Sequence, residues 1–360
     1  MVDVFDRIGG DDYEQVVFCH DLASGLRAIV AVHSTRLGPA LGGTRFYPYA
    51  SEAEGLEDVL RLAKAMTYKA AAAGLDLGGG KAVIFGDPAR DKTEALLRAY
   101  ARHVEALGGR YLTAEDVGTT QDDMDLVRRE TRFVTGVSRE LGGSGDPSAA
   151  TAYGVLWAMK AVALRLWGDT SLVGRHVAVA GVGKVGRALL VHLAEERARM
   201  TVADVTPASI EWAVAEVGAE AVAVEKVHAT ECDIYAPCAL GGVLNTQTIP
   251  ELRCAAVVGS ANNQLADGEV SARLLADAGV LYAPDFVANA GGLVNIAEEL
   301  APGGYHPDLA QAAVRRIFDT VTSVLQAADA DGVSTAQAAD RLAETRIAAL
   351  SAVHQIRIRS

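Results

Sequence analysis

A glycine-rich turn between a predicted strand and a predicted helix constrains the fold of this chain more than any other feature. Residues 175–180 are a short apolar run typical of a buried strand, and residues 187–196 continue as a helix. Between them lies Gly-Val-Gly-Lys-Val-Gly, and a second strand signal ends at Asp204, 18 residues after the last of these glycines. A G-x-G-x-x-G sequence in this context is typical of a parallel α/β fold that binds a dinucleotide.

The chemistry of this turn predicts a particular dinucleotide. Its glycines permit a tight turn, close approach of a pyrophosphate and close packing of helix on strand, while the helix N-terminus favours the anion. Asp204 would accept hydrogen bonds from ribose hydroxyls and repel a 2′-phosphate, so the sequence predicts NAD over NADP. FAD binding and a loop that has lost its cofactor are the alternatives for the motif alone. The predicted cofactor-binding residues of the loop are Gly181, Val182, Gly183, Lys184, Val185 and Gly186.

Four further strand signals follow this motif along the chain. With the two strands above they make six, and a doubly wound parallel sheet in the order 3-2-1-4-5-6 is the expected arrangement. Three segments come directly after strands and would line the nicotinamide end of the crevice, although each also suits a helix cap or a turn. The strand signals are residues 221–224, 233–237, 255–259 and 280–283, and the segments are 238–242, 260–264 and 289–292.

The length of the chain predicts two domains. A chain of 360 residues is too long for one comfortable hydrophobic core. The segment 139–148, rich in Gly, Ser and Pro, is the best candidate for a linker. We therefore predict an N-terminal α/β domain over residues 1–147 and a Rossmann NAD-binding domain over residues 148–335. Residues 336–360 are predicted to form a C-terminal helix that packs back on the first domain.

Two lysines stand in small and apolar company between residues 66 and 84. Lys69 lies near the end of a predicted helix, just before four alanines, and Lys81 follows three consecutive glycines, at which we expect the backbone to bend sharply. An ammonium group among such residues loses hydration, which disfavours its charged form unless an anion is bound. We infer a substrate pocket in which one lysine holds a carboxylate and the other does proton chemistry. The alternative is a surface helix, a turn and an ordinary lysine.

An acidic residue is placed to meet the second lysine. Lys81 begins the predicted strand 81–85, and Asp116 lies just after the predicted strand 110–115. In α/β proteins ligands bind beyond the carboxyl ends of strands, so the two side chains are expected to face one cleft and share a proton. A purely structural salt bridge is the alternative.

The N-terminal part has its own strand and helix signals. Residues 16–19 and 27–34 are predicted to form a hairpin. Residues 37–45 are predicted to form a glycine-rich loop that presents backbone N–H groups to a ligand, or a plain turn. Ser51 and Glu54 form a predicted capping box at the start of a helix.

Composition excludes several classes of function. Acidic residues outnumber basic ones by 46 to 33, and the net charge of −13 disfavours nucleic acid and anionic membrane surfaces as partners. The four cysteines include no Cys-x-x-Cys pair, so neither a metal site nor a disulfide framework is expected. Free thiols and the lack of a signal-peptide pattern favour the cytoplasm as the location.

Several motifs together resemble the family of leucine, valine, phenylalanine and glutamate dehydrogenases, and most closely its branched-chain members. The resemblance spans roughly residues 13 to 350. The motifs that carry it are Thr-Tyr-Lys-Ala-Ala-Ala-Ala-Gly (67–74), Gly-Gly-Gly-Lys-Ala-Val-Ile (78–84), Thr-Ala-Glu-Asp-Val-Gly-Thr (113–119), the dinucleotide turn (181–186) and Gly-Ser-Ala-Asn-Asn-Gln (259–264).

This resemblance implies reversible NAD-dependent oxidative deamination of an aliphatic L-amino acid, such as valine, leucine or isoleucine, to the 2-oxo acid and ammonia. It also implies a homo-oligomer built through a first domain that binds the substrate. The same reaction on phenylalanine or tryptophan is the closest alternative. From a different class, a non-catalytic NAD-binding protein is disfavoured because both lysines and Asp116 are present.

The resemblance also implies roles for individual residues. Lys69 would bind the substrate carboxylate, Lys81 would be the catalytic lysine of lowered pKa, and Asp116 would be its acid–base partner. Asn262 would contact the substrate and the cofactor, and Thr151 would meet the nicotinamide carboxamide. Backbone contacts to the carboxylate are expected from Gly42 and Gly43, and the apolar side-chain pocket from Leu41, Met66, Ala114, Leu293 and Ile296.

That pocket bears on the choice of substrate. Its apolar residues would leave a glutamate side chain unpaired, so glutamate is disfavoured. Leu293 and Ile296 stand where smaller valines are expected in leucine dehydrogenases, which narrows or reshapes the pocket. One methylene is worth only about 1–3 kcal/mol in such a pocket, so activities on valine, isoleucine and leucine should overlap.

Overall fold

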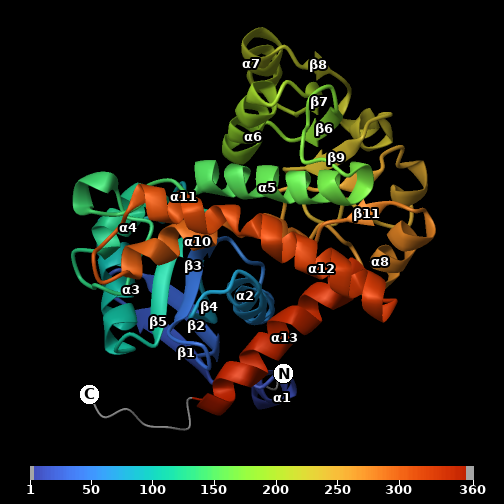
Figure 1. The fold of residues 1–360 in the computed structure, drawn as a ribbon. Coiled ribbons are helices and arrows are strands. Elements are labelled where there is room, and N and C mark those ends of the chain that lie inside the picture. The colour runs from blue at the N-terminus through green and yellow to red at the C-terminus, as the bar shows by residue number, and fades with distance from the viewer. Residues whose placement is uncertain (1–3, 354–360) are drawn as a thin grey trace. The chain divides into compact units, whose positions relative to one another are not determined.

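A computed structural model of the protein describes residues 4–353, and the chain divides into two compact units (Figure 1). We call them unit 1 and unit 2 and describe each by itself. The chain returns to unit 1 twice after leaving it, and no sequence feature indicated the first, short return. Unit 1 consists of Met1–Asp146, Ile296–Pro307 and Ala343–Ser360, and unit 2 of Pro147–Asn295 and Asp308–Leu342.

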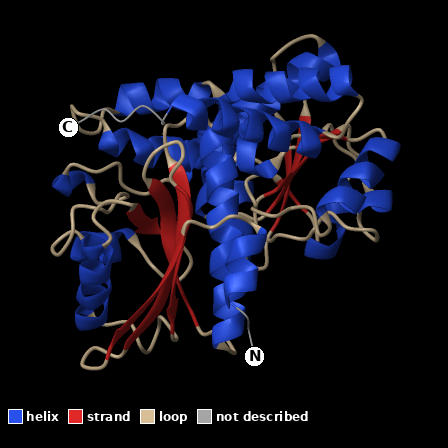
Figure 2. Cartoon of the chain, turned by 90° about the horizontal axis from the view of Figure 1, so that it is seen from below, coloured by secondary structure: helices blue, strands red, loops and turns tan. Residues whose placement is uncertain are grey.

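Unit 1 is built on a five-stranded mixed sheet, drawn in red in Figure 2. Its strand order is β1-β2-β4-β3-β5, with β3 parallel to both of its neighbours and the other pairs antiparallel. The predicted hairpin is confirmed as β1 paired with β2. The strands are β1 (Gln15–Asp21), β2 (Leu26–Ser34), β3 (Ala40–Tyr47), β4 (Gly78–Phe85) and β5 (Tyr111–Glu115).

Helices pack on both faces of this sheet. On one face, Val59 of α2 (Glu52–Ala72) packs in one cluster with Ile29 and Val83 of the strands. On the other face, α3 (Glu94–Ala106) and α4 (Gln121–Val127) pack against a larger cluster. Successive residues of a strand point to opposite faces, so Lys81 shares the α2 face with Val83. A short helix, α1 (Val4–Gly10), precedes the sheet.

The helix predicted after Ser51 is confirmed as α2. The Ser51 hydroxyl accepts the Glu54 N–H at 3.2 Å. The Glu54 carboxylate accepts the N–H of Ala50 at 2.9 Å, one residue before the partner that the predicted capping box requires. The helix ends before Gly74, which adopts a left-handed φ of 73°.

Two predictions about glycine-rich segments are wrong. Residues 37–45 are not a loop, because most of them belong to the interior strand β3. The three glycines before Lys81 do not bend the chain, because they lie within β4. They permit close packing instead: a Cβ on Gly78 would lie 1.8 Å from the carbonyl oxygen of Ser34, and one on Gly79 would lie 2.1 Å from the nitrogen of Thr67.

Unit 2 contains a six-stranded sheet in the order β11-β10-β9-β6-β7-β8, with every pair parallel. Numbered from its first strand, this is the predicted doubly wound order 3-2-1-4-5-6, which is confirmed. The strands are β6 (His176–Ala180), β7 (Arg199–Ala203), β8 (Glu220–Ala221), β9 (Ile234–Pro237), β10 (Ala256–Val257) and β11 (Leu281–Tyr282).

The remaining helices complete the two units. Across residues 4–353, no helix is both long enough and apolar enough to cross a membrane. The α-helices are α5 (Ser148–Trp167), α6 (Lys184–Glu195), α7 (Pro207–Val217), α8 (Gly268–Asp277), α9 (Asp285–Ala288), α10 (Gly291–Ala297), α11 (Pro307–Arg315), α12 (Ile317–Asp331) and α13 (Thr335–Val353). Short 3-10 helices cover Arg139–Leu141, Val224–Ala229, Ile249–Glu251 and Glu298–Leu300.

Candidate active site

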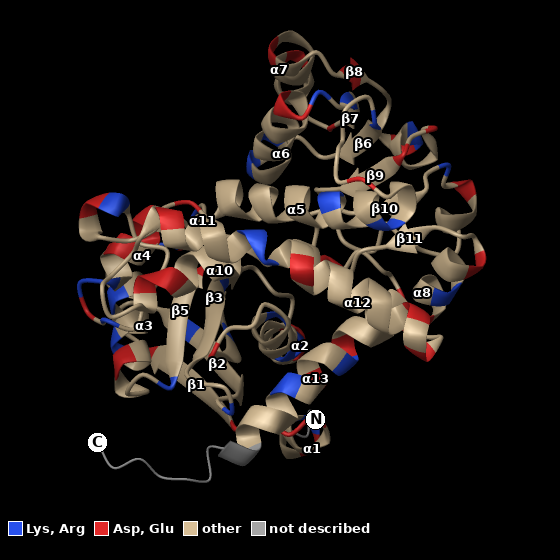
Figure 3. Cartoon of the chain, viewed as in Figure 1, with Lys and Arg blue, Asp and Glu red and all other residues tan. Residues whose placement is uncertain are grey.

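Two interior strands of unit 1, β3 and β4, each carry a largely buried basic side chain, whereas the charged residues of this unit lie mainly on helices and loops (Figure 3). Lys81 on β4 has only 7% of its side chain exposed, and its Nζ lies 2.9 Å from Oδ2 of Asp116. Asp116 directly follows β5, and β3 separates β5 from β4 in the sheet. The structure therefore brings together the lysine and the acid that the sequence predicted to meet.

The intervening strand allows this approach because it has two glycines at this level. A Cβ on Gly42 would lie 1.7 Å from the carbonyl oxygen of Gly80. A Cβ on Gly43 would lie 2.4 Å from the carbonyl oxygen of Glu115 and 2.9 Å from Cβ of Asp116. The two glycine backbones therefore run directly beside the charged pair, where any larger residue would push the strands apart.

The loop after β5 fixes the position of Asp116. The Asp116 N–H donates to the hydroxyl of Thr119 at 2.9 Å, and this hydroxyl donates to the carbonyl of Thr44 on β3 at 2.8 Å. Gly118 has a φ of 81°, and a Cβ on it would lie 2.0 Å from the carbonyl oxygen of Phe46. The carboxylate is thus presented by a turn that lies against β3 at Thr44 and Phe46, just after Gly43 in the chain.

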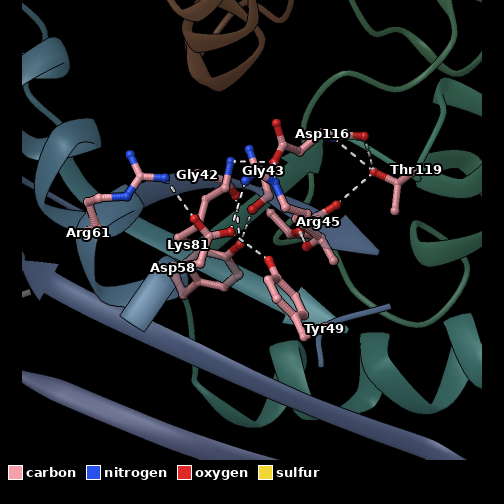
Figure 4. A network of polar contacts seen from close by, with 12 residues as sticks. Gly42, Gly43, Arg45, Tyr49, Asp58, Arg61, Lys81, Asp116 and Thr119 are labelled. Atoms are coloured by element: carbon pink, nitrogen blue, oxygen red, sulfur yellow. Dashed lines mark hydrogen bonds and ion pairs between the residues drawn. The ribbon is translucent and has the colours of Figure 1, made fainter. Parts of the chain in front are cut away.

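A second ion pair continues the site, and sequence reasoning did not identify it (Figure 4). Arg45 on β3 donates its Nε to Oδ2 of Asp116 at 3.0 Å and its Nη1 to Oδ2 of Asp58 at 2.9 Å. The Tyr49 hydroxyl donates to the same Asp58 oxygen at 2.6 Å. The one sequence feature that could have indicated this ion pair is the position of Arg45, two residues after Gly43. The structure shows that this run is an interior strand, where a charged side chain needs a partner.

The charges of this network decide the protonation of its acids. Burial by itself would raise the pKa of Asp116, but the cations of Lys81 and Arg45 lower that pKa to about 2. Burial likewise opposes, but does not overcome, the lowering of the pKa of Asp58 by Tyr49 and Arg45. Burial and the hydrogen bond to Asp58 raise the pKa of Tyr49. At neutral pH both carboxylates are therefore ionised acceptors and the phenol is a neutral donor.

The other residues predicted to bind substrate are divided between the units. Lys69 lies half-buried in the last turn of α2, and Met66 lies half-buried one turn earlier. Leu41 and Ala114 are buried in β3 and β5 of the same unit. Ile296 also belongs to unit 1, whereas Leu293 and Asn262 belong to unit 2.

The glycines of the dinucleotide turn in unit 2 perform three different tasks. Gly181 has a φ of 108°, and a Cβ on it would lie 2.7 Å from Cβ of Ala239. A Cβ on Gly186 would lie 2.1 Å from the carbonyl oxygen of Gly181, so this glycine allows α6 to pack closely on the turn. Around Gly183 no described atom lies within 4 Å of such a Cβ, which leaves space for a pyrophosphate.

The acid after β7 lies against this turn. Asp204 accepts the N–H of Val182 through Oδ2 and the N–H of Thr206 through Oδ1, each at 2.7 Å. Burial opposes these two hydrogen bonds, which nevertheless keep the pKa of Asp204 below its usual value. An ionised carboxylate beside the turn suits the hydroxyls of a ribose, so turn and acid together fit a dinucleotide.

Two asparagines of unit 2 form a polar corner after the strands. Asn289 donates its Nδ2 to Oδ1 of Asn262 at 2.8 Å and to the carbonyl of Ser260 at 3.1 Å. The buried Oδ1 of Asn289 has no hydrogen-bond partner within the described residues 4–353, so it can accept from an amide group of a ligand. Thr151 on α5 donates its hydroxyl to the carbonyl of Pro147 at 3.1 Å.

A dinucleotide-binding turn and a buried lysine–carboxylate pair in one chain define the class of a dehydrogenase. Leucine dehydrogenase of Bacillus cereus is 52% identical over 349 residues, which are 97% of this chain and 94% of that protein. Valine dehydrogenase of Streptomyces coelicolor is 54% identical over 340 residues, 93% of this chain and 92% of that protein. The crystal structure of L-tryptophan dehydrogenase from Nostoc punctiforme superposes with a TM-score of 0.83 at 41% identity, covering 96% of this chain and 99% of that one.

Two family domains also match. The Glu/Leu/Phe/Val dehydrogenase dimerisation domain matches residues 13–133, and the Glutamate/Leucine/Phenylalanine/Valine dehydrogenase domain matches residues 207–354. The chain belongs to the Glu/Leu/Phe/Val dehydrogenase family, and the resemblance inferred from its motifs is confirmed. It is an amino-acid dehydrogenase, an oxidoreductase that acts on a CH–NH2 group, in a family of NAD(P)-dependent enzymes.

The lowered pKa of Asp116 predicts how acid affects this site. Because that pKa is about 2 in the folded protein, against 3.8 ordinarily, ionised Asp116 stabilises the fold above about pH 4. This contribution, about 2 kcal/mol, is lost as the pH falls towards 2. The unfolding temperatures of the wild type and Asp116→Asn should therefore differ by a constant amount above pH 5 and converge below pH 4. Thermal scans at a series of pH values measure this, and a difference that does not change with pH contradicts it.

Proposed function

We propose that this enzyme uses NAD to deaminate a branched-chain aliphatic L-amino acid, such as valine, leucine or isoleucine, reversibly to the 2-oxo acid and ammonia. The observation that carries the proposal is the contact of the buried Lys81 with Asp116 beside the backbones of Gly42 and Gly43. The pair sits in a chain whose relatives, at half or more identity over nearly its full length, are leucine and valine dehydrogenases.

The polar groups of unit 1 that the motifs single out each have a task in this reaction. Lys69 holds the carboxylate of the amino acid, with help from the N–H groups of Gly42 and Gly43. Bound NAD would supply the acceptor for the hydride of Cα, and the substrate would then be an imine. Lys81 holds and moves the proton of the water that attacks the imine carbon, and Asp116 holds and moves a proton of the departing amine. Acid–base help of this kind is worth about 10²–10⁴-fold in rate.

The substrate side chain is proposed to contact only apolar groups. Among the candidates in unit 1, Leu41 and Ala114 are buried, Met66 is half-buried and Ile296 is 8% exposed. A charged side chain among these residues would lose its hydration without gaining a partner. An aromatic amino acid is the second candidate, because a solved relative of similar fold is an L-tryptophan dehydrogenase.

Unit 2 and the family match support the proposed cofactor and assembly. The loop from Gly181 to Gly186 holds the pyrophosphate, Asp204 the ribose, and Asn262 and Thr151 the nicotinamide end. The dimerisation domain over residues 13–133 supports a homo-oligomer built through unit 1.

A panel of L-amino acids tests the substrate class. Purified enzyme with NAD should show its highest kcat/KM on valine, leucine or isoleucine, because the pocket offers apolar contacts of moderate size. Glutamate should be a poor substrate, because its carboxylate has no partner there. The nicotinamide absorbance follows each reaction. A higher kcat/KM on phenylalanine or tryptophan would select the second candidate.

Replacing Lys81 tests the chemical step. Lys81→Ala should bind NAD with wild-type affinity, since the dinucleotide turn is in unit 2, while kcat falls by at least about 10²-fold. Lys64→Ala is the matched control, because Lys64 lies on α2 and pairs with Asp11. NAD titration and steady-state kinetics measure the two properties. A Lys81→Ala enzyme with a near wild-type rate would place the proton chemistry on another residue.

Replacing Asp204 tests the choice of cofactor. The wild type should prefer NAD over NADP in kcat/KM, because the carboxylate repels a 2′-phosphate. Asp204→Ser should reduce this preference mainly by lowering kcat/KM for NAD. Equal use of both cofactors by the wild type would remove the proposed role of Asp204.

A further inference from the structure

Asp116 is contacted by two cations rather than one. Its Oδ2 lies 2.9 Å from Nζ of Lys81 and 3.0 Å from Nε of Arg45, so a single carboxylate oxygen serves both (Figure 4). The proposed reaction uses only the lysine. Arg45 is 22% exposed at its side chain and cannot release its proton at any working pH. It can therefore act on the reaction only through the carboxylate that it holds.

The other end of Arg45 is held as firmly. Its Nη1 lies 2.9 Å from Oδ2 of Asp58, whose side chain is only 15% exposed. Asp58 is fixed in turn by the Tyr49 hydroxyl at 2.6 Å and by Nη2 of Arg61 at 2.8 Å. Because a guanidinium is planar, contacts at two of its nitrogens fix its orientation as well as its position.

We propose that Arg45, clamped by Asp58, is a positioning residue that keeps Asp116 ionised and aimed at Lys81. Without this arginine, one cation would remain beside a largely buried carboxylate, and the carboxylate could turn towards other donors. A carboxylate that loses one of two adjacent cations binds a proton more readily. The titratable groups that act on Asp116 are Lys81 from β4, Arg45 from β3, Tyr49 after β3 and Tyr111 from β5. Asp58 from α2 contacts the far end of Arg45.

The role of Arg45 can be tested without turnover, so the test does not depend on the proposed substrate. The measurement is the difference in unfolding temperature between proteins with Asp116 and with Asp116→Asn, taken across pH. We call the pH at which this difference disappears the closing pH. In an Arg45→Met background the closing pH should rise by about one unit or more, because Asp116 has lost a cation. Arg45→Lys restores a charge and should move the closing pH back towards the wild-type value. A closing pH that is unchanged in Arg45→Met overturns the proposal.

The catalytic consequence rests on the proposed function and is tested separately. Arg45→Met should lower kcat by about 10²-fold, with a smaller change in the KM for the amino acid, since misplacement of a reacting group acts on the chemical step. In an Asp116→Asn background the same substitution should have little further effect, because Arg45 acts through Asp116. Equal losses of kcat in both backgrounds overturn the proposal.

The matched control is Arg27→Met. Arg27 also lies on a strand of unit 1 and pairs with a carboxylate, Glu52, at 2.8 Å, but at an exposed position on β2. It should leave kcat and the closing pH unchanged. If the wild type turns over no branched-chain amino acid, the proposed function fails while the thermal measurement still decides the role of Arg45.

Discussion

The site depends on the neutralisation of two cations that belong to the interior of a sheet. Lys81 and Arg45 project from β4 and β3, and a buried ammonium or guanidinium without an anion costs several kcal/mol. Asp116 supplies that anion from the end of β5, and Asp58 supplies a second one from α2. The acids come from different elements than the cations, so the charges are balanced only when sheet and helix have assembled. The charge balance of the site therefore requires both the sheet and α2.

Glycine residues make the close packing of these strands possible because they have no side chain. At Gly42 and Gly43, a Cβ would strike the backbone of the neighbouring strands. At Gly79, one would strike the backbone of α2. The absence of side chains lets the strands carrying the charges pack closely and leaves backbone N–H groups beside them. In unit 2, Gly181 and Gly186 likewise allow close packing, which shapes the turn for a pyrophosphate.

Periodic patterns predicted the regular parts of the fold well, and two glycine-rich segments of unit 1 were the exception. The parallel sheet of unit 2 was predicted with its strand order, because apolar runs alternating with helical segments allow few topologies. Residues 37–45 were predicted as a loop because glycine locally favours turns. In the folded chain they pair with β4 and β5, and tertiary packing decides the conformation. The return of residues 296–307 to unit 1 had no local signal at all.

The sequence by itself determined the family, the dinucleotide turn with Asp204, and the pairing of a lysine with Asp116. Each of these was inferred from residue types and spacings in short motifs or next to predicted strands. Only the tertiary structure decided that Arg45 and Asp58 join the pair, because their contacts connect residues 71 and 13 positions apart in the chain. It also decided that one oxygen of Asp116 serves both cations. Distances between side chains on different strands depend on register and on close backbone packing, which no local pattern specifies.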